Sequence, residues 1–293
     1  MEKAILKTLS YYDIFKFPLK AWEIHKYLIG KSSDLKQTEK ALKSLIKKGK
    51  IKKQKDYYFL FGHSGLVKSR LEREVISISH LKTAKFISNL FRLIPTIKLV
   101  GVSGSLSMMG SRKEDDIDLF IITSKNRIWV SRLFLIILTS LTGLRRKRHE
   151  KILSANGKIC INLILEEESL EQEKKNIYLA HEVLQMRLLW QKEEIYSDFL
   201  HANSWAFKYL PNWRSSIIEN RKSKTKSQKY KSKIKTLGLI DRFEVFAKKF
   251  QLKIMGSPDK SERIENHALY FHPEDKGVKI IKSYNKRLKL LNK

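Results

Sequence analysis

Cysteine is almost absent from this chain, since Cys160 is the only one among 293 residues. A single thiol excludes an internal disulfide and a zinc site built from cysteines, and it fits a reducing compartment. The opening residues, MEKAILKTLSYYDIF, also lack the long apolar core of a signal peptide. These two absences predict a cytoplasmic protein.

Acidic residues are scarce relative to basic ones. The chain carries 60 Lys and Arg against 30 Asp and Glu, which gives a formal net charge of +30. An enzyme of small metabolites does not need this excess, whereas it favours a polyanionic partner such as nucleic acid, because each neutralised phosphate releases counterions. A membrane surface that carries anionic lipid is the competing explanation.

Long uninterrupted apolar runs are missing as well. The run IWVSRLFLIILTSLTGL at 128–144 approaches membrane length, but Arg132 interrupts it. Its uninterrupted part is shorter than the roughly 20 residues that a spanning helix needs. We therefore predict no transmembrane segment and expect this run to form a buried helix.

The sequence does contain a pair of strands with polar residues at their ends, VGVSGSLSMMGSRKEDDIDLFIIT at 100–123. Apolar residues suited to a buried strand lead to Gly104 and Ser105. A second apolar strand follows at 117–122, with Asp116 and Asp118 at its head. Side chains two residues apart on a strand share a face, so the two carboxylates lie side by side.

This arrangement indicates phosphate and metal chemistry. Two adjacent acids repel each other unless a cation lies between them, and ligands that are all oxygen suit Mg²⁺. A Gly-Ser turn after a strand offers free backbone N–H groups, and glycine lets the backbone approach a phosphate closely. The simpler alternative is an ordinary strand-turn-strand unit with an acidic turn.

An apolar strand, Gly-Ser, ten residues and then Asp-apolar-Asp-apolar resembles the nucleotidyltransferase signature of the DNA polymerase β superfamily. The likeness is close over 97–123 and looser to about residue 165. It implies that Gly104 and Ser105 bind the β- and γ-phosphates of a nucleoside triphosphate such as ATP. It also implies that Asp116 and Asp118 are catalytic and bind one or two Mg²⁺ (or Mn²⁺) ions.

The family pattern places a third carboxylate on a later strand, and here the sequence departs from it. The predicted strand at 158–165, KICINLIL, has Asn162 in the third position. An amide brings one carbonyl oxygen to a metal, but it carries no charge and is no general base. Glu166 shares the parity of Asn162 but lies about 13 Å further along, so it substitutes only if the strand bends.

Four consecutive cations, Arg145, Arg146, Lys147 and Arg148, follow the predicted buried helix. A cationic cap that satisfies the helix dipole explains one or two of them. The run of four favours contact with a polyanion, either a triphosphate or an RNA backbone.

The stretch 166–213 has an all-helical pattern in which His181, Glu182 and Gln185 lie close together. No second histidine has the spacing of a zinc helix, so we expect these residues to line a pocket or the surface. Beyond it, every charged residue in 220–235 is basic, which is typical of a linker or a disordered arm. Helical patterns return at 237–254 and in the last stretch, whose basic helix we expect to dock on the core rather than on a membrane.

Residues 1–62 resemble a winged-helix domain in layout. A first helix near the start is broken at Phe17-Pro18, and a short second one ends near Gly30. A third begins at Asp34 with Gln37 as its capping box and precedes a hairpin at 51–61. The third helix carries the lysines Lys36, Lys40, Lys43, Lys47 and Lys48. Nucleic-acid binding through that helix and a structural or protein-binding role are equally open.

A long helix at 63–94 is predicted to link this unit to the first strand. Leucine, isoleucine, valine and phenylalanine give it one apolar side, and Pro95 ends it. Its charged residues Arg70, Arg73 and Lys85 are expected to be solvated.

Together these patterns predict an α/β (α+β) protein with a mixed nucleotidyltransferase sheet flanked by helices. The predicted units are a winged-helix-like domain at 1–62, a linking helix at 63–95, the nucleotidyltransferase domain with appended helices at 96–212, a basic linker at 213–236 and a basic helical region at 237–293. The first hypothesis is metal-dependent transfer of a nucleoside monophosphate from a triphosphate to an acceptor hydroxyl. RNA is the favoured acceptor because of the charge, with a protein side chain or a small molecule as alternatives. The second hypothesis is a catalytically degenerate relative that acts as a nucleic-acid-binding or regulatory module.

Overall fold

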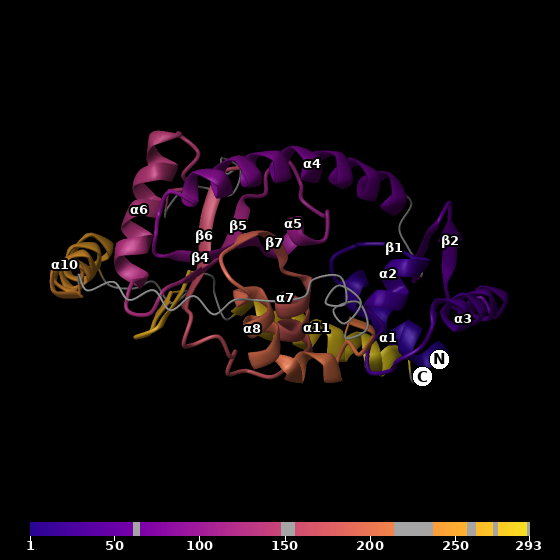
Figure 1. Ribbon diagram of the computed structural model, residues 1–293. Helices are drawn as coiled ribbons and strands as arrows, with labels where there is room; N and C mark the ends of the chain where they lie inside the picture. The colour runs from indigo at the N-terminus through magenta and orange to yellow at the C-terminus, as the bar shows by residue number, and fades with distance from the viewer. Residues whose placement is uncertain (61–64, 148–155, 214–236, 257–261, 272–274, 292–293) are drawn as a thin grey trace.

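The structure is a computed structural model that describes residues 1–60, 65–147, 156–213, 237–256, 262–271 and 275–291. Figure 1 shows the N-terminal helices at one end, a β-sheet in the middle and two helices, α6 and α10, at the other end. The described chain is a mixed α/β fold in which helices flank a mixed sheet, as the sequence predicts.

The N-terminal unit contains three helices and a small sheet. Its elements are α1 (Glu2–Asp13), β1 (Leu19–Lys20), α2 (Ala21–Lys26), α3 (Leu35–Lys47), β2 (Lys52–Gln54) and β3 (Tyr57–Phe59), with strand order β1-β3-β2. The carboxylate of Asp34 accepts a hydrogen bond from the N–H of Gln37 at 2.6 Å, which caps α3. The predicted capped helix and the hairpin after it are thus confirmed.

The central sheet contains six strands. They are β4 (Ile97–Val102), β5 (Ile117–Thr123), β6 (Ile159–Glu166), β7 (Arg187–Gln191), β8 (Arg263–Ile264) and β9 (Ala268–Tyr270), in the order β7-β4-β5-β6-β9-β8. Strands β5 and β6 are parallel, and the other neighbours are antiparallel. The three strands predicted around the motif are therefore confirmed as β4, β5 and β6.

Helices cover both faces of this sheet. They are α4 (Leu66–Phe91), α5 (Gly104–Ser107), α6 (Ile128–Leu141), α7 (Ile177–Gln185), α8 (Ile195–Ala202), the 3₁₀ helix η2 (Ser204–Lys208), α10 (Leu237–Met255) and α11 (Asp275–Leu291). Leu119 and Ile121 of β5 pack with α4 and α6 on one face, and Phe120 packs with α7 and α8 on the other. Because Asp118 shares the parity of Phe120, its side chain belongs to the α7 face.

Two parts of the sheet were not predicted. The stretch 166–213 was expected to be all-helical, but Arg187–Gln191 forms β7 and pairs with β4. The C-terminal region was also expected to be helical, but β8 and β9 extend the sheet beyond β6. These short strands owe their conformation to pairing with residues far away in the chain, which local pattern does not reveal.

Helix α4 packs in a way that the sequence did not suggest. Arg70 and Arg73, which were expected to be solvated, are buried, while the apolar residues Val75, Ile78 and Phe86 are exposed. The reason is that Arg70 and Arg73 find carboxylate and carbonyl partners inside the fold. Ion pairing and hydrogen bonds thus decide which face of this helix is buried.

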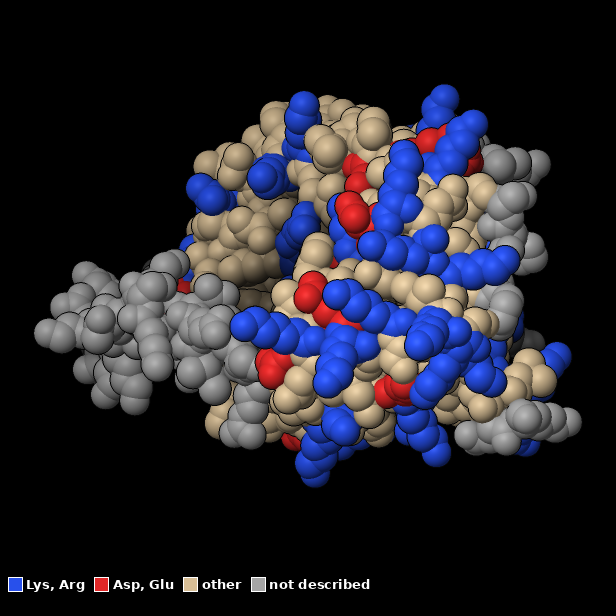
Figure 2. Space-filling model, turned by 90° about the vertical axis from the view of Figure 1, so that its right-hand side faces the viewer, with Lys and Arg blue, Asp and Glu red and all other residues tan. Residues whose placement is uncertain are grey.

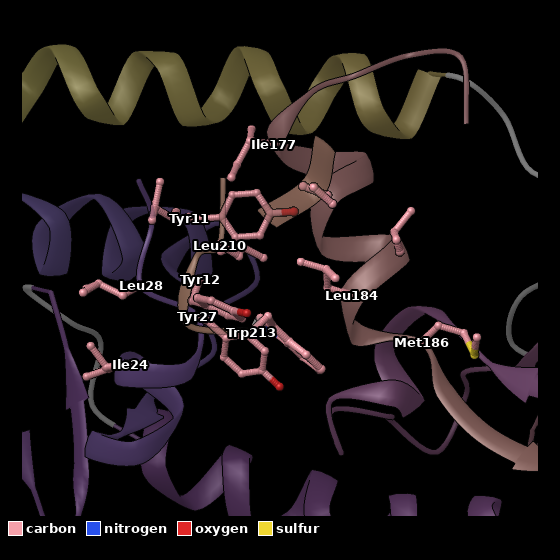
Figure 3. Packing of buried hydrophobic residues seen from close by; sticks show 14 of the residues in the cluster. Tyr11, Tyr12, Ile24, Tyr27, Leu28, Ile177, Leu184, Met186, Leu210 and Trp213 are labelled. Atoms are coloured by element: carbon pink, nitrogen blue, oxygen red, sulfur yellow. The ribbon is translucent and has the colours of Figure 1, made fainter. Parts of the chain in front are cut away.

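The N-terminal unit shares a core with the rest of the molecule. Tyr11, Tyr12 and Tyr27 from α1 and the end of α2 pack against Leu184 of α7 and against Trp213 (Figure 3). One buried cluster thus crosses the predicted boundary at residue 62. The domain limits remain a prediction. Of the predicted basic linker at 213–236, Trp213 belongs to this buried cluster and 214–236 lie outside the described residues.

The described helices include none with the length and hydrophobicity that a membrane crossing requires. Helix α6, which was expected to be buried, is covered on one side only. Its Trp129 and Leu135 are buried, whereas Phe134 and Leu141 are exposed.

Candidate functional site

The Gly-Ser turn lies directly against the carboxylate of Asp118. Strand β4 ends at Val102, the N–H of Ser103 donates to the backbone oxygen of Asp118 at 3.0 Å, and α5 starts at Gly104. Gly104 has a φ of +59°, and a Cβ at this position would lie 2.7 Å from Oδ2 of Asp118. A side chain would collide with the carboxylate there, so glycine allows the acid and the turn to meet.

Asp116 and Asp118 form a half-buried group with a third side chain, Cys160. One oxygen of each carboxylate and the Cys160 sulfur all lie within 4.8 Å of one another. Cys160 is the partner of Asp118 in the parallel register of β5 and β6. The sequence analysis did not identify this residue, although its side chain has the same parity as Asn162 and it lies two residues nearer the start of β6.

The Cys160 side chain behaves as a neutral thiol. Burial raises the pKa of the thiol well above its ordinary value, and the charges of Asp118 and Asp116 raise this pKa further. A neutral sulfur is a poor ligand for Mg²⁺, which prefers oxygen. The two carboxylates nevertheless fit Mg²⁺, because this ion is commonly held by one or two carboxylates together with water and substrate phosphates.

Arg146 is the cation that balances the acids. Its guanidinium makes an ion pair with Oδ2 of Asp116, and its backbone N–H donates to the oxygen of Ile159 at 3.0 Å. The neighbouring Arg145 instead donates to the hydroxyl of Ser140 in the last turn of α6, at 3.5 Å. Of the four predicted polyanion contacts, Arg146 thus reaches the site and Arg145 lies by the helix end. Arg148 lies outside the described residues.

Asp115 also belongs to the site. Strand β5 begins only at Ile117, so Asp115 lies in the preceding loop. Its Oδ2 accepts hydrogen bonds from the Ser105 hydroxyl at 3.0 Å and from the N–H of Arg112 at 2.9 Å. The Ser105 hydroxyl therefore has an acidic partner next to the Asp116 and Asp118 pair.

The acids open onto a cavity of about 540 Å³. Gly104, Ser105 and the three aspartates form one wall. The end of α1, the segment after it, and residues of α7 and α11 also line the cavity. The cavity also carries four basic side chains, which are Lys16, Arg73, Arg112 and Lys276. A cavity with acids at its base and cations around them suits a polyphosphate and its metal.

Asn162 lines the same cavity as the acids. The register of β5 and β6 shifts between Leu119 and Phe120, and Asn162 is the β6 residue at this irregularity. Its side chain borders the main cavity and a smaller adjoining one of about 190 Å³. Asn162 is therefore placed to touch a molecule bound in either cavity.

Glu166 does not substitute for the missing acid. It is buried at the other end of β6, opposite Thr123, and its Oε2 is 2.8 Å from Nδ1 of His267. The strand does not bend enough to bring it to Asp118, in agreement with the length estimated from the sequence.

Helix α7 brings a further carboxylate to the cavity. Glu182 and Gln185 line it, as the sequence reading expected, while His181 is buried against the rings of Tyr11 and Tyr12. The charge of Glu182 raises the pKa of the Tyr178 hydroxyl, and burial and the charge of Asp118 add to this shift. Tyr178 thus lies within electrostatic reach of acids on both walls.

A buried ion pair joins the N-terminal unit to the loop after the Gly-Ser turn. Arg70 pairs with Glu23 of α2 at 2.9 Å, and both side chains are only 3% exposed. Arg70 also donates to the backbone oxygens of Met108 at 3.1 Å and Met109 at 3.3 Å. Its guanidinium stacks on the ring of Phe17 at 3.9 Å from the ring centre. One side chain therefore positions both walls of the cavity.

Comparisons with known proteins give little. No family model matches the chain, and no curated protein matches it either. One solved structure, described as a crystal structure of a toxin-antitoxin with AMP-PNP, matches at 17% identity with a TM-score of 0.25. The match covers 51% of this chain and 98% of the other. At this TM-score the similarity carries no weight for fold or function.

Proposed function

We propose that this protein is a metal-dependent nucleotidyltransferase that moves a nucleoside monophosphate from a nucleoside triphosphate to an acceptor hydroxyl. The observation that carries the proposal is the contact between Gly104 and the carboxylate of Asp118, with Asp116 beside it, at the base of a cavity of about 540 Å³. The phosphate-binding turn and the metal-binding acids of the motif thus meet at one cavity.

The order of elements supports the resemblance on which this proposal draws. Strand β4, the short α5, strand β5, helix α6 and the parallel strand β6 follow one another around the acids. This supports placing residues 96–212 in the nucleotidyltransferase fold of the DNA polymerase β superfamily. The helix and strand order of residues 1–60 likewise supports a winged-helix domain.

In the proposed reaction the acceptor oxygen attacks the α-phosphorus of the triphosphate. The bond from this phosphorus to the bridging oxygen breaks, pyrophosphate leaves, and the acceptor proton passes to a carboxylate of the cavity. Asp116 and Asp118 would hold Mg²⁺ or Mn²⁺, which when bound neutralises charge on the phosphates. The backbone of Gly104 and Ser105 would bind the β- and γ-phosphates, and Arg112 lies in the same wall to balance their charge.

The proposed acceptor is RNA. Figure 2 looks onto the end of the molecule that holds the N-terminal unit, and Lys and Arg side chains spread over this face with few acids between them. The lysines of α3, Lys36, Lys40, Lys43 and Lys47, are exposed. Such a surface binds a phosphate backbone without reading its sequence.

A second candidate is a degenerate nucleotidyltransferase that binds a nucleotide or nucleic acid without transfer. Two observations favour it. Asp116 is already paired with Arg146, and among the described residues the acid group on β5 and β6 contains a thiol in place of a third carboxylate. Loss of a carboxylate that acts as general base lowers the catalytic rate more than it weakens substrate binding.

A transfer assay separates the two candidates. The purified protein is incubated with Mg²⁺ or Mn²⁺, total cellular RNA and each nucleoside triphosphate labelled at the α-phosphate. The test variant is Asp116→Ala/Asp118→Ala. The matched control is Glu167→Ala/Glu168→Ala, which removes two acids just beyond the end of β6, at the end of the strand away from Cys160. Labelled RNA in reactions with the wild type and with the matched control, but not with the Asp116→Ala/Asp118→Ala variant, supports the transferase. Metal-dependent nucleotide binding without transfer supports the degenerate candidate, and neither binding nor transfer contradicts both.

A further inference from the structure

Helix α10 exposes a row of large apolar side chains. Leu239, Phe243, Phe246 and Phe250 follow one another at intervals of four, three and four residues, which places them on one side of a helix. Leu239 is 78% exposed and Phe246 is 57% exposed. The three phenylalanine rings form a stacked ladder, with ring centres 6.3 Å and 5.9 Å apart.

The side of α10 next to this row is fixed to α6, so the helix cannot rotate to bury the row. Ala247 is fully buried against α6. The carboxylate of Glu244 accepts hydrogen bonds from the N–H groups of Trp129 at 2.8 Å and Val130 at 2.9 Å, which caps the first turn of α6. Gln251 donates to the oxygen of Trp129 at 2.7 Å. The apolar row is therefore held outward by specific polar contacts.

Helix α6 extends the apolar surface. Its Phe134 contacts Phe243 with ring centres 6.4 Å apart, and its Leu141 is 79% exposed. We call Phe134, Leu239, Phe243, Phe246 and Phe250 the α6–α10 apolar face. Figure 1 places these two helices together at the end of the molecule away from the N-terminal unit. Single exposed apolar residues need no explanation, but a joined group on two helices marks an interaction surface.

The charges around this face are of one sign. At 100° per residue, Arg242, Lys249 and Lys253 follow directly on the solvent side of the α10 row, and all three are exposed. The two acids of α10 lie on the other side. Asp241 pairs with Arg127 at 2.7 Å, and Glu244 caps α6. In the sequence just before α10, every charged residue from 221 to 235 is Lys or Arg.

We propose that the α6–α10 apolar face binds a membrane surface that carries anionic lipid. Phenylalanine and leucine on one side of a helix, with Lys and Arg at the border, are the composition of helices that lie in the plane of a bilayer interface. Anionic headgroups attract the border cations and the apolar side chains enter the acyl boundary. A second copy of the chain would face this border with the same cations, because a two-fold interface brings identical patches together. Nucleic acid would satisfy the cations but leave the phenylalanines exposed.

The test is cosedimentation of the full chain with vesicles of phosphatidylcholine, alone or mixed with phosphatidylglycerol. The wild type should sediment with the mixed vesicles and remain largely soluble with phosphatidylcholine alone. The Phe243→Asp/Phe246→Asp variant should lose at least about tenfold in affinity for the mixed vesicles, since both apolar side chains leave the interface.

A control variant distinguishes binding through the α6–α10 apolar face from nonspecific attraction of a basic protein to anionic vesicles. Ile78→Asp/Phe86→Asp makes the same charge change on the exposed side of α4 and should retain binding. Circular dichroism and thermal unfolding confirm that each variant is folded. An equal loss in both variants, or no sedimentation of the folded wild type, would overturn the proposal. So would a dimer in light scattering that the α10 variant alone abolishes, because the occupant would then be a second copy.

Discussion

Two arginine and carboxylate pairs in this molecule look alike and differ in what surrounds them. Arg70 and Glu23 are both 3% exposed, and Arg70 has further partners in Glu74, two backbone oxygens and a phenylalanine ring. Arg146 and Asp116 are 21% and 16% exposed, and Asp116 opens onto the cavity beside Asp118. The first pair is enclosed, whereas the second faces a space that a substrate can enter.

One kind of contact thus serves two purposes in this molecule. An enclosed pair cannot exchange partners, so breaking it leaves a buried charge and costs stability. A pair at a cavity can exchange Arg146 for a metal or a phosphate, so its acids are available for chemistry. We expect changes at the first pair to alter unfolding and changes at the second to alter activity.

The largest expected effect is on activity at the open site. Asp118→Asn keeps the shape of the side chain and removes its charge, so several kcal/mol of stabilisation at the phosphates should be lost. This corresponds to a decrease in kcat of about 10³-fold or more. The melting temperature should change little, and thermal unfolding checks this. Full activity in the variant would show that the acid pair is not the reacting site.

The next effect concerns the enclosed pair. Arg70→Met should lower the free energy of unfolding by about 3 kcal/mol, because Glu23 remains buried without its cation. This loss of stability is at the lower end of the range for broken buried ion pairs, because Glu23 still accepts a hydrogen bond from the N–H of Lys20 at 2.8 Å. Urea unfolding measures it. The matched control is Lys48→Met at the exposed pair with Glu2, where we expect a much smaller change in the free energy of unfolding. Equal effects in the two variants would contradict the comparison.

The contact between the N-terminal unit and α7 should make stability depend on pH. Burial lowers the pKa of His181 to about 3 from its ordinary value of 6.5. Below pH 6.5 the unfolded chain therefore binds a proton that the folded chain excludes, so stability is complete above this pH and declines as the pH falls toward 3. We expect a loss of about 2 kcal/mol between pH 7.5 and pH 5 from this group.

The measurement for this prediction is urea unfolding of the wild type and His181→Gln at both pH values. Other groups titrate in the same range, so the difference between the two proteins is the informative quantity. The variant should show the smaller decrease. Parallel decreases in both proteins would mean that His181 is not the cause.

The smallest expected effect is at the cation of the open pair. Arg146→Gln should change stability by less than about 1 kcal/mol, because both partners reach solvent. It should also tighten Mn²⁺ binding about fivefold, since a guanidinium no longer competes for Asp116, and about 1 kcal/mol corresponds to such a factor. Electron paramagnetic resonance of free Mn²⁺ measures this affinity without nucleotide. Weaker binding in the variant would mean that Arg146 supports the metal instead of competing with it.

Sequence patterns predicted the local part of this fold. The helix capped by Asp34, the hairpin after it and the strands β4, β5 and β6 all have period and turn signals that act over a few residues. The meeting of Gly104 with Asp118 was also within reach, because a short span joins them. The role of Cys160 was not, since it depends on the register between two parallel strands.

Tertiary contacts account for the other differences. Strand β7 forms because β4 offers it an edge to pair with. The residues 187–191 carry no local pattern that predicts a strand. Arg70 and Arg73 are buried because groups from distant segments accept hydrogen bonds from them, although the sequence pattern predicts that their side of α4 is solvated. Burial of charge is a property of the assembled partners rather than of the helix.

We propose that the Asp116 and Asp118 pair catalyses nucleotidyl transfer, and labelling the triphosphate at two positions tests this proposal. Parallel reactions contain RNA, Mg²⁺ or Mn²⁺ and the same nucleoside triphosphate labelled at either the α- or the γ-phosphate. With the wild type, we predict that the α-label enters RNA and that the γ-label is recovered in pyrophosphate. With the Asp116→Ala/Asp118→Ala variant, we predict that no α-label enters RNA and that no labelled pyrophosphate forms. Transfer of γ-label to the acceptor, or unchanged α-label transfer by the folded double variant, would contradict the account.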